Sequence, residues 1–516
     1  MGTFKESKAN INIFGALLRA RKKFGGTRDA IIDADDSVFT YNEIVRASFA
    51  LGSAIKVDTD ARERVGILLP TSVGCLLAFF ALQAFGRVPA MLNFTAGAHN
   101  LKAAFKMAQI SKVLTSKKFI KLANLEALIE NLVPHVKVIY LEDVKRNISK
   151  KDKLVAVFGS TFPALFATKT SYKKPAVILF TSGTEGDPKG VVLSHKNLVA
   201  NVEQVRAHID ELYPKSDVVF NPLPTFHCFG LTAGVLLPLF AGLKLALYPS
   251  PLHIKIIPER IKKLGTTILF ATDTFISRYA RSAKEGSLDS LRFAVCGAEQ
   301  VRPETRAFLQ KKFGVIILEG YGATETSPIA AVNRPNANRQ GTVGHFMPGT
   351  KYRLEPVDGI NTGGRLMLKG PNVMMGYLTT DKPGEIQYLE DGWHDMGDIV
   401  DVDEEGFVSI KGRVKRFANI GGETISLTVV ENCAKAVWPD NEHVALILPD
   451  PNKGEKIVVI SDSKVINRDD IRTWTQQHGV PELAIPRKVF TVAEIPLLGT
   501  GKVDYAGAQK LMESLT

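Results

Sequence analysis

Hydrophobic positions along most of the chain fall into short apolar runs that alternate with longer segments of helical periodicity. The runs are rich in Val, Ile, Leu and Phe, and they predict strands at residues 64–69, 112–115, 136–141, 176–180, 267–270, 293–296 and 315–318. Amphipathic or buried helices are expected between them. Because strands that alternate with helices form parallel sheets, this part of the chain is predicted to be a layered α/β structure.

The pattern changes near Gly349. Strands are expected at residues 351–355, 364–369, 399–402 and 407–410, joined by turns that contain Gly, Asp and Asn. These short strands indicate a β-rich subdomain. From about Gly412, helices at 427–437 and 469–478 and strands at 444–448, 456–461 and 488–492 indicate a small α+β domain. The predicted fold class is therefore α/β, with a large N-terminal domain of layered α/β subdomains, a β-rich subdomain and a small C-terminal α+β domain.

One uncharged stretch, residues 65–85 between Arg64 and Arg87, is long enough to span a bilayer. Pro70, Thr71 and Ser72 interrupt it near its start. Since proline disrupts the interior of a helix, we expect a buried strand at 65–69 and a buried helix at 73–85 instead of a membrane span.

Composition narrows the class of protein. The 516 residues are 45% hydrophobic and 23% charged, which excludes disordered, collagen-like and disulfide-scaffold chains. Cys75, Cys228, Cys296 and Cys433 are scattered without a CxxC pair, so neither a zinc site nor a disulfide framework is indicated. The formal net charge of +12 favours anionic partners such as nucleotides, acidic proteins or anionic lipids. The basic residues are dispersed and form no recognised nucleic-acid motif, so no nucleic-acid partner is expected.

A stretch between two predicted strands gathers hydroxyl groups, glycines and one lysine: Thr181, Ser182, Gly183, Thr184, Glu185, Gly186, Asp187, Pro188, Lys189 and Gly190. Glycines let the backbone turn tightly and bring its N–H groups against phosphate oxygens, while Lys189 adds positive charge. The spacing differs from that of a Walker A loop or a dinucleotide fingerprint. It predicts a polyphosphate-binding loop, and a plain surface turn is the alternative.

Two further clusters carry candidate nucleotide-binding groups. After the strand at 315–318, the ring of Tyr321 can stack on a base, Thr324 can donate to a phosphate and Glu325 offers an oxygen to Mg²⁺. Residues 392–398 are expected to form a turn that enters the strand at 399–402. Asp398 at the end of that turn suits a pair of ribose hydroxyls, and a turn-capping role is the alternative.

The three clusters occur in this order and are followed by Gly499, Thr500, Gly501 and Lys502. In this pattern the chain resembles the adenylate-forming superfamily of acyl- and aryl-CoA synthetases, peptide-synthetase adenylation domains and luciferases, from about residue 27 to residue 505. Within it, residues 179–186, 247–253, 412–418 and 478–484 are most similar to the acyl-carrier-protein synthetase half of the bifunctional 2-acylglycerophosphoethanolamine acyltransferase/synthetase. No histidine has Asp five positions on, so a free-standing synthetase is expected, with any acyltransferase in trans.

The resemblance implies a two-step ligation in which a fatty carboxylate reacts with ATP to give an acyl-adenylate, and a thiol then displaces AMP. It implies that Thr181 through Lys189 hold the β- and γ-phosphates, that Thr324 touches the α-phosphate and that Glu325 holds Mg²⁺. Asp398 would bind the ribose with help from Arg413, and Lys502 would reach the acyl carboxylate. His227 would sit beside that carboxylate, with a purely structural histidine as the alternative. The adenine side would be lined by Gly297, Ala298 and Glu299 and by Tyr321 between Gly320 and Gly322.

The resemblance also implies an AMP-binding adenylation domain at residues 1–415 and a mobile C-terminal domain at 416–516 that carries Lys502. The hinge would lie near Lys415 and Arg416. Two positions depart from the common pattern. Glu185 stands where most members have a hydroxyl residue or Gly, and a carboxylate beside a triphosphate is unfavourable unless a cation compensates. Arg416 stands where Asp or Lys is commoner.

The expected acid is a long-chain fatty acid, and the small residues at 271–275 are compatible with an acyl pocket. No carrier domain follows Lys502 in this sequence, so the thiol is expected from another molecule. The branch resemblance favours acyl carrier protein, which is acidic and which the basic run at 145–153 would attract, although a solvated loop also explains that run. A fatty acyl-CoA ligase and a non-catalytic fatty acid or nucleotide binder are the alternatives. We expect a cytoplasmic protein with peripheral contact to the inner face of the cytoplasmic membrane.

Overall fold

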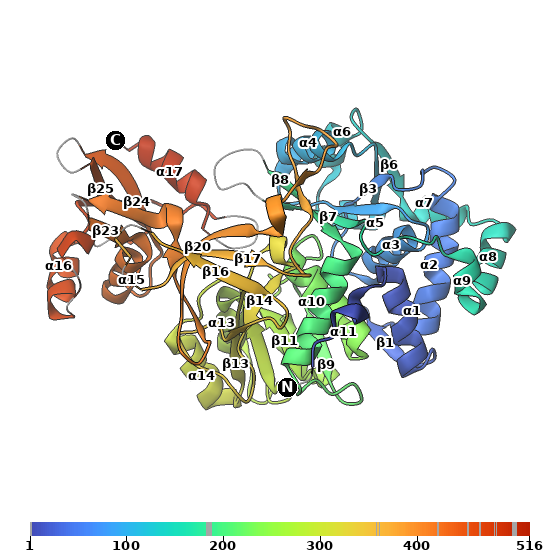
Figure 1. Cartoon of the computed structure of the whole chain (residues 1–516), viewed down its shortest axis with the longest axis horizontal. Coiled ribbons are helices and arrows are strands. Elements are labelled where there is room, and N and C mark those ends of the chain that lie inside the picture. Colours follow the sequence, from blue (N-terminus) through green and yellow to red (C-terminus); the bar gives the residue numbers. More distant parts are fainter. Residues whose placement is uncertain are drawn as a thin grey trace. The chain divides into compact units, whose positions relative to one another are not determined.

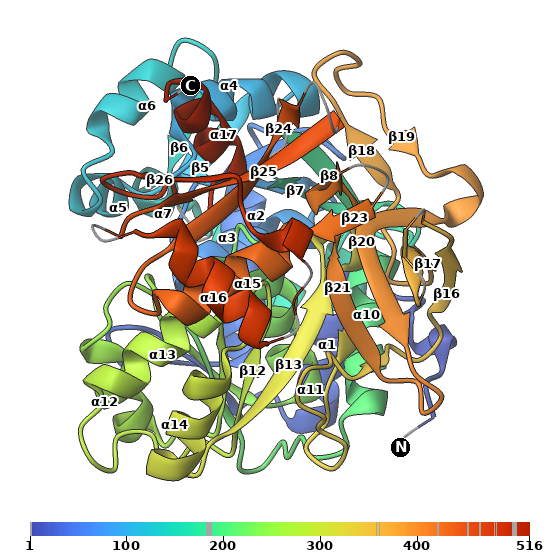
Figure 2. The same ribbon diagram turned by 90° about the vertical axis from the view of Figure 1, so that its left-hand side faces the viewer.

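The computed structural model describes residues 3–181, 188–357, 359–360, 362–420, 423–450, 454–463, 466–478, 480, 482–497 and 503–515. Its contacts divide the chain into two compact units (Figures 1 and 2). Unit 1 comprises Met1–Lys351 and Lys369–His394, and unit 2 comprises Tyr352–Leu368 and Asp395–Thr516.

Unit 1 contains two large sheets whose central strands run parallel. The nine-stranded sheet has the order β15-β14-β13-β12-β11-β9-β10-β1-β2, and the eight-stranded sheet has the order β19-β18-β8-β7-β4-β3-β5-β6. The strands of the first are β1 (Asp29–Ile32), β2 (Val38–Thr40), β9 (Val218–Asn221), β10 (Lys244–Leu247), β11 (Ile268–Ala271), β12 (Phe293–Cys296), β13 (Ile316–Gly322), β14 (Ile329–Val332) and β15 (His345–Phe346). Those of the second are β3 (Arg64–Ile67), β4 (Val88–Met91), β5 (Lys112–Thr115), β6 (Lys137–Tyr140), β7 (Pro175–Thr181), β8 (Lys189–Ser194), β18 (Gly376–Leu378) and β19 (Gln387–Tyr388).

The helices of unit 1 cover these sheets. They are η1 (Glu6–Ala9), α1 (Ile13–Phe24), α2 (Tyr41–Ile55), α3 (Val73–Ala84), α4 (Gly97–Ala108), α5 (Lys117–Leu122), α6 (Glu126–Leu132), α7 (Leu141–Arg146), α8 (Lys150–Thr161), α9 (Pro163–Phe166), α10 (His195–His208), the π-helix η2 (Phe229–Leu236), α11 (Leu237–Ala241), α12 (Ile256–Leu264), α13 (Asp273–Ser282), α14 (Pro303–Phe313), η3 (Thr324–Thr326) and η4 (Glu390–Gly392).

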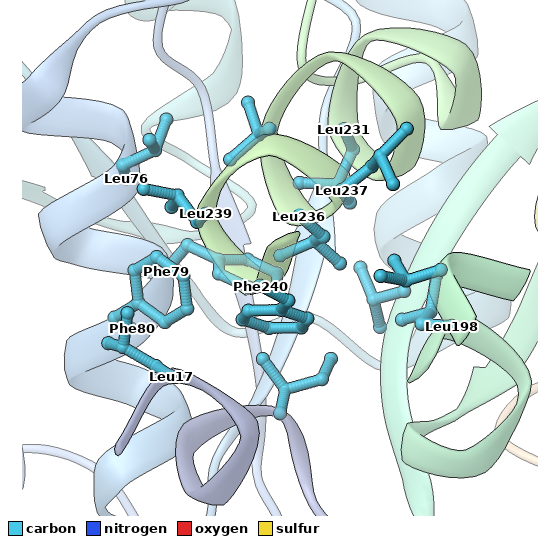
Figure 3. Close-up of a cluster of buried hydrophobic side chains, with 14 of the residues drawn as sticks. Leu17, Leu76, Phe79, Phe80, Leu198, Leu231, Leu236, Leu237, Leu239 and Phe240 are labelled. Atoms are coloured by element: carbon cyan, nitrogen blue, oxygen red, sulfur yellow. The ribbon is translucent and has the colours of Figure 1, made fainter. Parts of the chain in front are cut away.

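Buried side chains show how the layers stack. One core contains residues from both sheets together with α1, α3, α10 and α11, so these helices lie between the sheets. Figure 3 shows Leu76, Phe79 and Phe80 of α3 meeting Leu239 and Phe240 of α11. A second core joins α12, α13 and α14 to the nine-stranded sheet, and a third joins α4, α5 and α6 to the eight-stranded sheet. The predicted layered α/β fold is therefore confirmed.

The long uncharged stretch is part of this core. It forms β3 and then the buried helix α3, as predicted, and burial of each phenylalanine of α3 is worth about 2–3 kcal/mol. Within the described residues, no helix combines the length and the apolar character needed to cross a membrane. The four cysteines are buried free thiols.

Unit 2 contains a four-stranded sheet and a smaller α+β part. The sheet has the order β16-β17-β20-β21. Its strands are β16 (Lys351–Glu355), β17 (Gly364–Lys369), β20 (His394–Val402) and β21 (Val408–Arg413). The second part comprises η5 (Val414–Arg416), β22 (Phe417–Ile420), β23 (Glu423–Ser426), α15 (Leu427–Val437), β24 (His443–Asp450), β25 (Gly454–Ser461), α16 (Arg468–Gln477), η6 (Glu482–Ala484), β26 (Lys488–Thr491) and α17 (Tyr505–Glu513). Both the β-rich subdomain and the terminal α+β part were predicted (Figure 2).

Two predicted boundaries are wrong at the site. Strand β13 continues through Gly320, Tyr321 and Gly322, because the antiparallel neighbour β14 prolongs the ladder beyond the parallel part of the sheet. Strand β20 begins at His394, so Asp398 lies within a strand instead of in a turn before one. Gly397, which belongs to the predicted turn, adopts φ +66° inside the strand.

Candidate active site

The predicted phosphate-binding loop joins the paired strands β7 and β8. Thr181 lies opposite Lys189 in this antiparallel pair, and its Oγ1 donates to the Lys189 carbonyl at 3.5 Å. Lys189 is exposed, and its Nζ lies 5.1 Å from the ring centroid of Tyr377, within the range of a cation–π contact. The predicted loop residues Ser182, Gly183, Thr184, Glu185 and Gly186 lie outside the described residues.

Tyr377 links Lys189 to Glu325. It lies on β18, which pairs with β8 so that Tyr377 stands opposite Val191. Its hydroxyl donates to Oε1 of Glu325 at 2.7 Å, a hydrogen bond strengthened by the charge of the carboxylate. A cation from the start of β8 and a carboxylate from η3 thus both contact Tyr377. Sequence reasoning missed Tyr377, because only the pairing of β18 with β8 brings it there.

The turn that carries Thr324 and Glu325 is held by buried amide side chains. Nδ2 of Asn372 donates to the carbonyl of Thr326 at 2.9 Å, and the backbone N–H of Met374 donates to the carbonyl of Glu325 at 2.8 Å. On α10, Asn201 exchanges two hydrogen bonds with the backbone of Ile329, at 2.7 and 3.1 Å. These bonds fix the backbone on both sides of η3.

Helix α10 supplies three such amides on one face. Asn197 donates to the carbonyl of Val373 at 2.6 Å, and Gln204 donates to Oδ1 of Asn372 at 3.2 Å. Asn197, Asn201 and Gln204 are spaced by four and three residues, which places them on one side of a helix. Three amide side chains at this spacing within a buried helix were a signal in the sequence for this hydrogen-bonded group of amides, and the sequence analysis did not use it.

The predicted adenine side lies where β12 and β13 run side by side. A Cβ atom on Gly297 would stand 3.3 Å from the carbonyl of Gly320, so the two backbones are in close contact. Ala298 adopts φ +70°, a conformation that is uncommon for a residue with a side chain and that concentrates at functional sites. Oε2 of Glu299 accepts the first-turn N–H of Thr274 on α13 at 2.9 Å, so this carboxylate orients the loop. Tyr321 is buried in β13.

The loop that carries His227 follows β9 and reaches the same edge of the sheet. The His227 ring packs on Phe226 with centroids 4.7 Å apart. Burial raises the pKa of the adjacent Cys228 thiol to about 12, and the negative charge of Glu325 contributes, so this loop lies within electrostatic reach of Glu325. The ring of Phe229 lies 3.6 Å from the Cβ position of Gly297. Carboxyl ends of parallel strands are the usual location of ligands in α/β sheets.

In unit 2, Asp398 and Arg413 face each other across β20 and β21. Nε of Arg413 lies 3.2 Å from Oδ1 of Asp398, whose side chain is buried while that of Arg413 is exposed. The structure therefore brings these two predicted residues together. Lys502 lies outside the described residues.

Arg416, at the expected hinge, is anchored in the terminal α+β part. Its Nη1 donates to the carbonyl of Ala445 at 2.9 Å, its Nη2 pairs with Glu431, and its guanidinium lies 4.1 Å from the ring centroid of Tyr505. Burial raises the pKa of Glu431 and the positive charge of Arg416 opposes this shift. The Arg416 side chain thus belongs to the body that follows it in the chain.

Comparisons with known proteins identify a family for this chain. The model of the AMP-binding enzyme family matches residues 18–378. The long-chain-fatty-acid–CoA ligase of Salmonella typhimurium is 28% identical over 425 residues, which cover 79% of this chain and 74% of that protein. The long-chain-fatty-acid–CoA ligase of Bacillus subtilis is 26% identical over 503 residues, which cover 90% and 88%.

A crystal structure of an anthranilate CoA ligase with anthranoyl-AMP has a TM-score of 0.82 and 22% identity, and the match covers 99% of this chain and 100% of that one. The fold class is thereby confirmed. These relatives are named as CoA ligases, and none of the three is named as a carrier-protein synthetase, so the narrower branch resemblance gains no support from them. The family model covers well over half of the chain, which therefore belongs to the AMP-binding enzyme family and is an ATP-dependent, AMP-forming acid–thiol ligase.

Proposed function

We propose that this protein joins a long-chain fatty acid to coenzyme A while ATP is cleaved to AMP and pyrophosphate. The observation that carries the proposal is its similarity, over most of its length, to two ligases of long-chain fatty acids and coenzyme A. The same similarity favours coenzyme A over acyl carrier protein as the thiol. The site geometry supports the first step, because Lys189 and Glu325 stand together around Tyr377.

The chemistry explains why a nucleotide is needed. A free carboxylate has no leaving group, whereas AMP leaves readily once it is bonded to the acyl carbon. In the first step a carboxylate oxygen bonds to the α-phosphorus. The bond between this phosphorus and the oxygen that bridges to the β-phosphate breaks, and pyrophosphate departs. In the second step the sulfur of the thiol bonds to the acyl carbon, its proton is lost and AMP departs. The protein must hold anions in line and neutralise the charge that develops.

Residues of unit 1 would bind the triphosphate. Thr181, Lys189 and the loop between them would hold the β- and γ-phosphates, and Thr324 would donate to the α-phosphate. Glu325 fits a magnesium ion, because Mg²⁺ bound with nucleotides takes one or two carboxylates and completes its shell from phosphates and water. No group of three His, Cys, Asp or Glu side chains gathers anywhere in the described ranges, so an ion here would depend on ATP for its other ligands. When bound, it would neutralise phosphate charge.

Separate roles are proposed for the residues that would bind the nucleoside. Gly297, Ala298 and Tyr321 would line the adenine, since close backbone approach and a buried ring provide a flat apolar contact. Asp398 would accept hydrogen bonds from the two ribose hydroxyls, with Arg413 holding the carboxylate in place. His227 would face the acyl carboxylate.

We further propose that residues 416–516 move as one domain and deliver Lys502 to the acyl carboxylate in the first step. A Lys502→Ala variant should lose pyrophosphate release while it still transfers the acyl group from supplied acyl-adenylate to the thiol. Equal loss of the two half-reactions would remove Lys502 from this role. Asp398→Ala should weaken ATP binding, and an unchanged ATP affinity would remove Asp398 from the ribose.

The function itself is tested by a thiol competition. Purified protein receives ATP, Mg²⁺ and palmitate with equal concentrations of coenzyme A and holo acyl carrier protein, and the acylated product is identified by mass spectrometry. Palmitoyl-CoA as the main product is expected. Acylated carrier protein as the main product would show that the carrier protein, and not coenzyme A, is the thiol acceptor. Absence of pyrophosphate release with every fatty acid tried would overturn fatty acid activation.

A further inference from the structure

Helices α8 and α9 and the residue between them expose five large apolar side chains. These residues, called the α8–α9 apolar stripe below, are Leu154, Val157, Phe158, Phe162 and Leu165. Leu154, Val157 and Phe158 are related by three and four residues and so share one side of α8, whereas Phe162 is the non-helical residue between α8 and α9. Leu165 is 81% exposed, Leu154 57% and Phe162 54%. Single exposed apolar residues are ordinary, but a contiguous apolar surface marks an interaction site.

The opposite side of α8 is the one that belongs to the core. Helix α8 packs on α2, and Figure 1 shows α8 and α9 at the outer edge of unit 1 beyond that helix. Gly159 lies against the ring of Phe49, where a Cβ atom would stand 2.9 Å from the ring. The buried carboxylate of Asp152 accepts a hydrogen bond from Ser53 at 2.6 Å. The stripe therefore faces away from α2, on the side where a surface helix normally carries polar residues.

The stripe lies in a basic stretch of the sequence. Residues 145–174 contain eight basic residues, and Asp152, which is buried, is their single acidic residue. The basic residues are Lys145, Arg146, Lys150, Lys151, Lys153, Lys169, Lys173 and Lys174, all exposed. The acidic residue that precedes this segment, Asp143, pairs with Lys117 at 2.7 Å. An apolar stripe flanked by lysines is the composition of helices that lie in the surface of an anionic membrane.

We propose that the α8–α9 apolar stripe docks on an anionic lipid bilayer, with its side chains in the acyl region and the flanking lysines at the phosphate groups. Charge complementarity selects this occupant. A second copy of the chain would bring the same eight basic residues against the first, so a symmetric pair through this face is disfavoured by repulsion. The proposal goes beyond the ligase activity, because binding to lipid needs neither ATP nor fatty acid.

The test is co-sedimentation of the full-length protein with vesicles, without nucleotide or fatty acid. Vesicles of phosphatidylcholine mixed with anionic phosphatidylglycerol are compared with vesicles of pure phosphatidylcholine. The Leu154→Ser/Leu165→Ser variant should lower the partition coefficient on anionic vesicles at least tenfold. The matched control is Leu122→Ser/Leu252→Ser, which makes the same change at leucines that are 73% and 63% exposed elsewhere on unit 1, and it should bind like the wild type.

Charge is tested with Lys150→Glu/Lys151→Glu, which places acidic residues in the first turn of α8, where they favour the helix. Binding to anionic vesicles should fall, and the dependence of binding on salt should weaken. Retained ATP-dependent pyrophosphate release shows that each variant is folded. Absence of wild-type binding to anionic vesicles, or equal binding of the stripe and control variants, overturns the proposal. The proposal is also overturned if the wild-type protein does not bind vesicles but forms a dimer or is retained by an acidic protein, and the Leu154→Ser/Leu165→Ser variant abolishes that association.

Discussion

Tyr377→Phe is the smallest change that separates the two contacts of this side chain. It removes the hydroxyl that donates to Oε1 of Glu325 at 2.7 Å and leaves the ring beside Nζ of Lys189. If the phenol holds the Glu325 carboxylate in position for the Mg²⁺ of ATP, its loss should leave a carboxylate that samples other rotamers. The chain's fold should change little, because Phe has the same ring and no new polar group is buried.

The magnitude follows from the charge of the acceptor. A hydrogen bond to a charged group contributes about 1.5–3 kcal/mol, and Glu325 is only half-buried, so a value near 1.5 kcal/mol is expected. Such a loss corresponds to roughly a tenfold fall in kcat/KM for ATP, since about 1.4 kcal/mol is a factor of ten. The Mg²⁺ concentration that gives half-maximal activity should rise. Tyr377→Leu also removes the ring beside Lys189, and a surface cation–π contact adds about 0.5–1 kcal/mol to the loss.

The assay is pyrophosphate release with palmitate and saturating coenzyme A, repeated over a range of Mg²⁺ concentrations. Tyr388→Phe, at an exposed tyrosine on the neighbouring strand β19, is the matched control. The reasoning is refuted when Tyr377→Phe and Tyr388→Phe give the same kcat/KM and the same Mg²⁺ dependence. A fall in kcat/KM without any shift in the Mg²⁺ dependence would show that the hydroxyl acts on something other than a metal-binding carboxylate.

Three further predictions concern the framework of the site. Asn372→Ala should lower the free energy of unfolding by about 2 kcal/mol, because it leaves the carbonyl of Thr326 buried without its donor; thermal denaturation measures this, and an unchanged midpoint would contradict it. Arg416→Met should destabilise the terminal α+β part by about 2 kcal/mol, because the part-buried Glu431 would lose its cation; adding Glu431→Gln should restore most of the loss in urea unfolding, and no restoration would contradict the pairing. Burial lowers the pKa of His195 to about 4, so between pH 6.5 and 4 the unfolded chain binds a proton that the folded chain does not. As the pH is lowered through this range, His195 should therefore reduce the free energy of unfolding by up to about 1.4 kcal/mol per pH unit. His195→Asn should flatten that part of the profile, and an equally steep profile would show that His195 is not its source.

The sequence predicted most strands of unit 1 because their signals are local. The strands at 112–115 and 293–296 have the predicted bounds, since each is a short apolar run that is buried between layers of helices. The limits of β13 and β20 could not be predicted in the same way. Strand β13 continues through Gly320 and Gly322 because the antiparallel neighbour β14 pairs with it. Strand β20 lies between β17 and β21, and its own sequence does not contain these neighbours.

The same distinction applies to the site. Lys189, Glu325 and Asp398 could be selected from the sequence because each belongs to a short cluster whose composition suits phosphate, metal or ribose. Tyr377 belongs to no such cluster, and its role depends on the register that sets it opposite Val191. Arg413 is an intermediate case, since the resemblance proposed it as a partner of Asp398 and the cross-strand register accounts for the contact.

The amides of α10 explain why a short irregular turn can hold Thr324 and Glu325 in fixed positions. The segments around η3 lie in the interior, where backbone N–H and C=O groups without partners would each cost about 1–3 kcal/mol. Asn201 and Asn372 supply those partners, and α10 is itself fixed because its other residues are buried between the two sheets. The packing of the central core therefore determines the position of the Glu325 backbone. It follows that substitutions on α10 far from ATP should alter the dependence of the reaction on Mg²⁺ before they abolish folding.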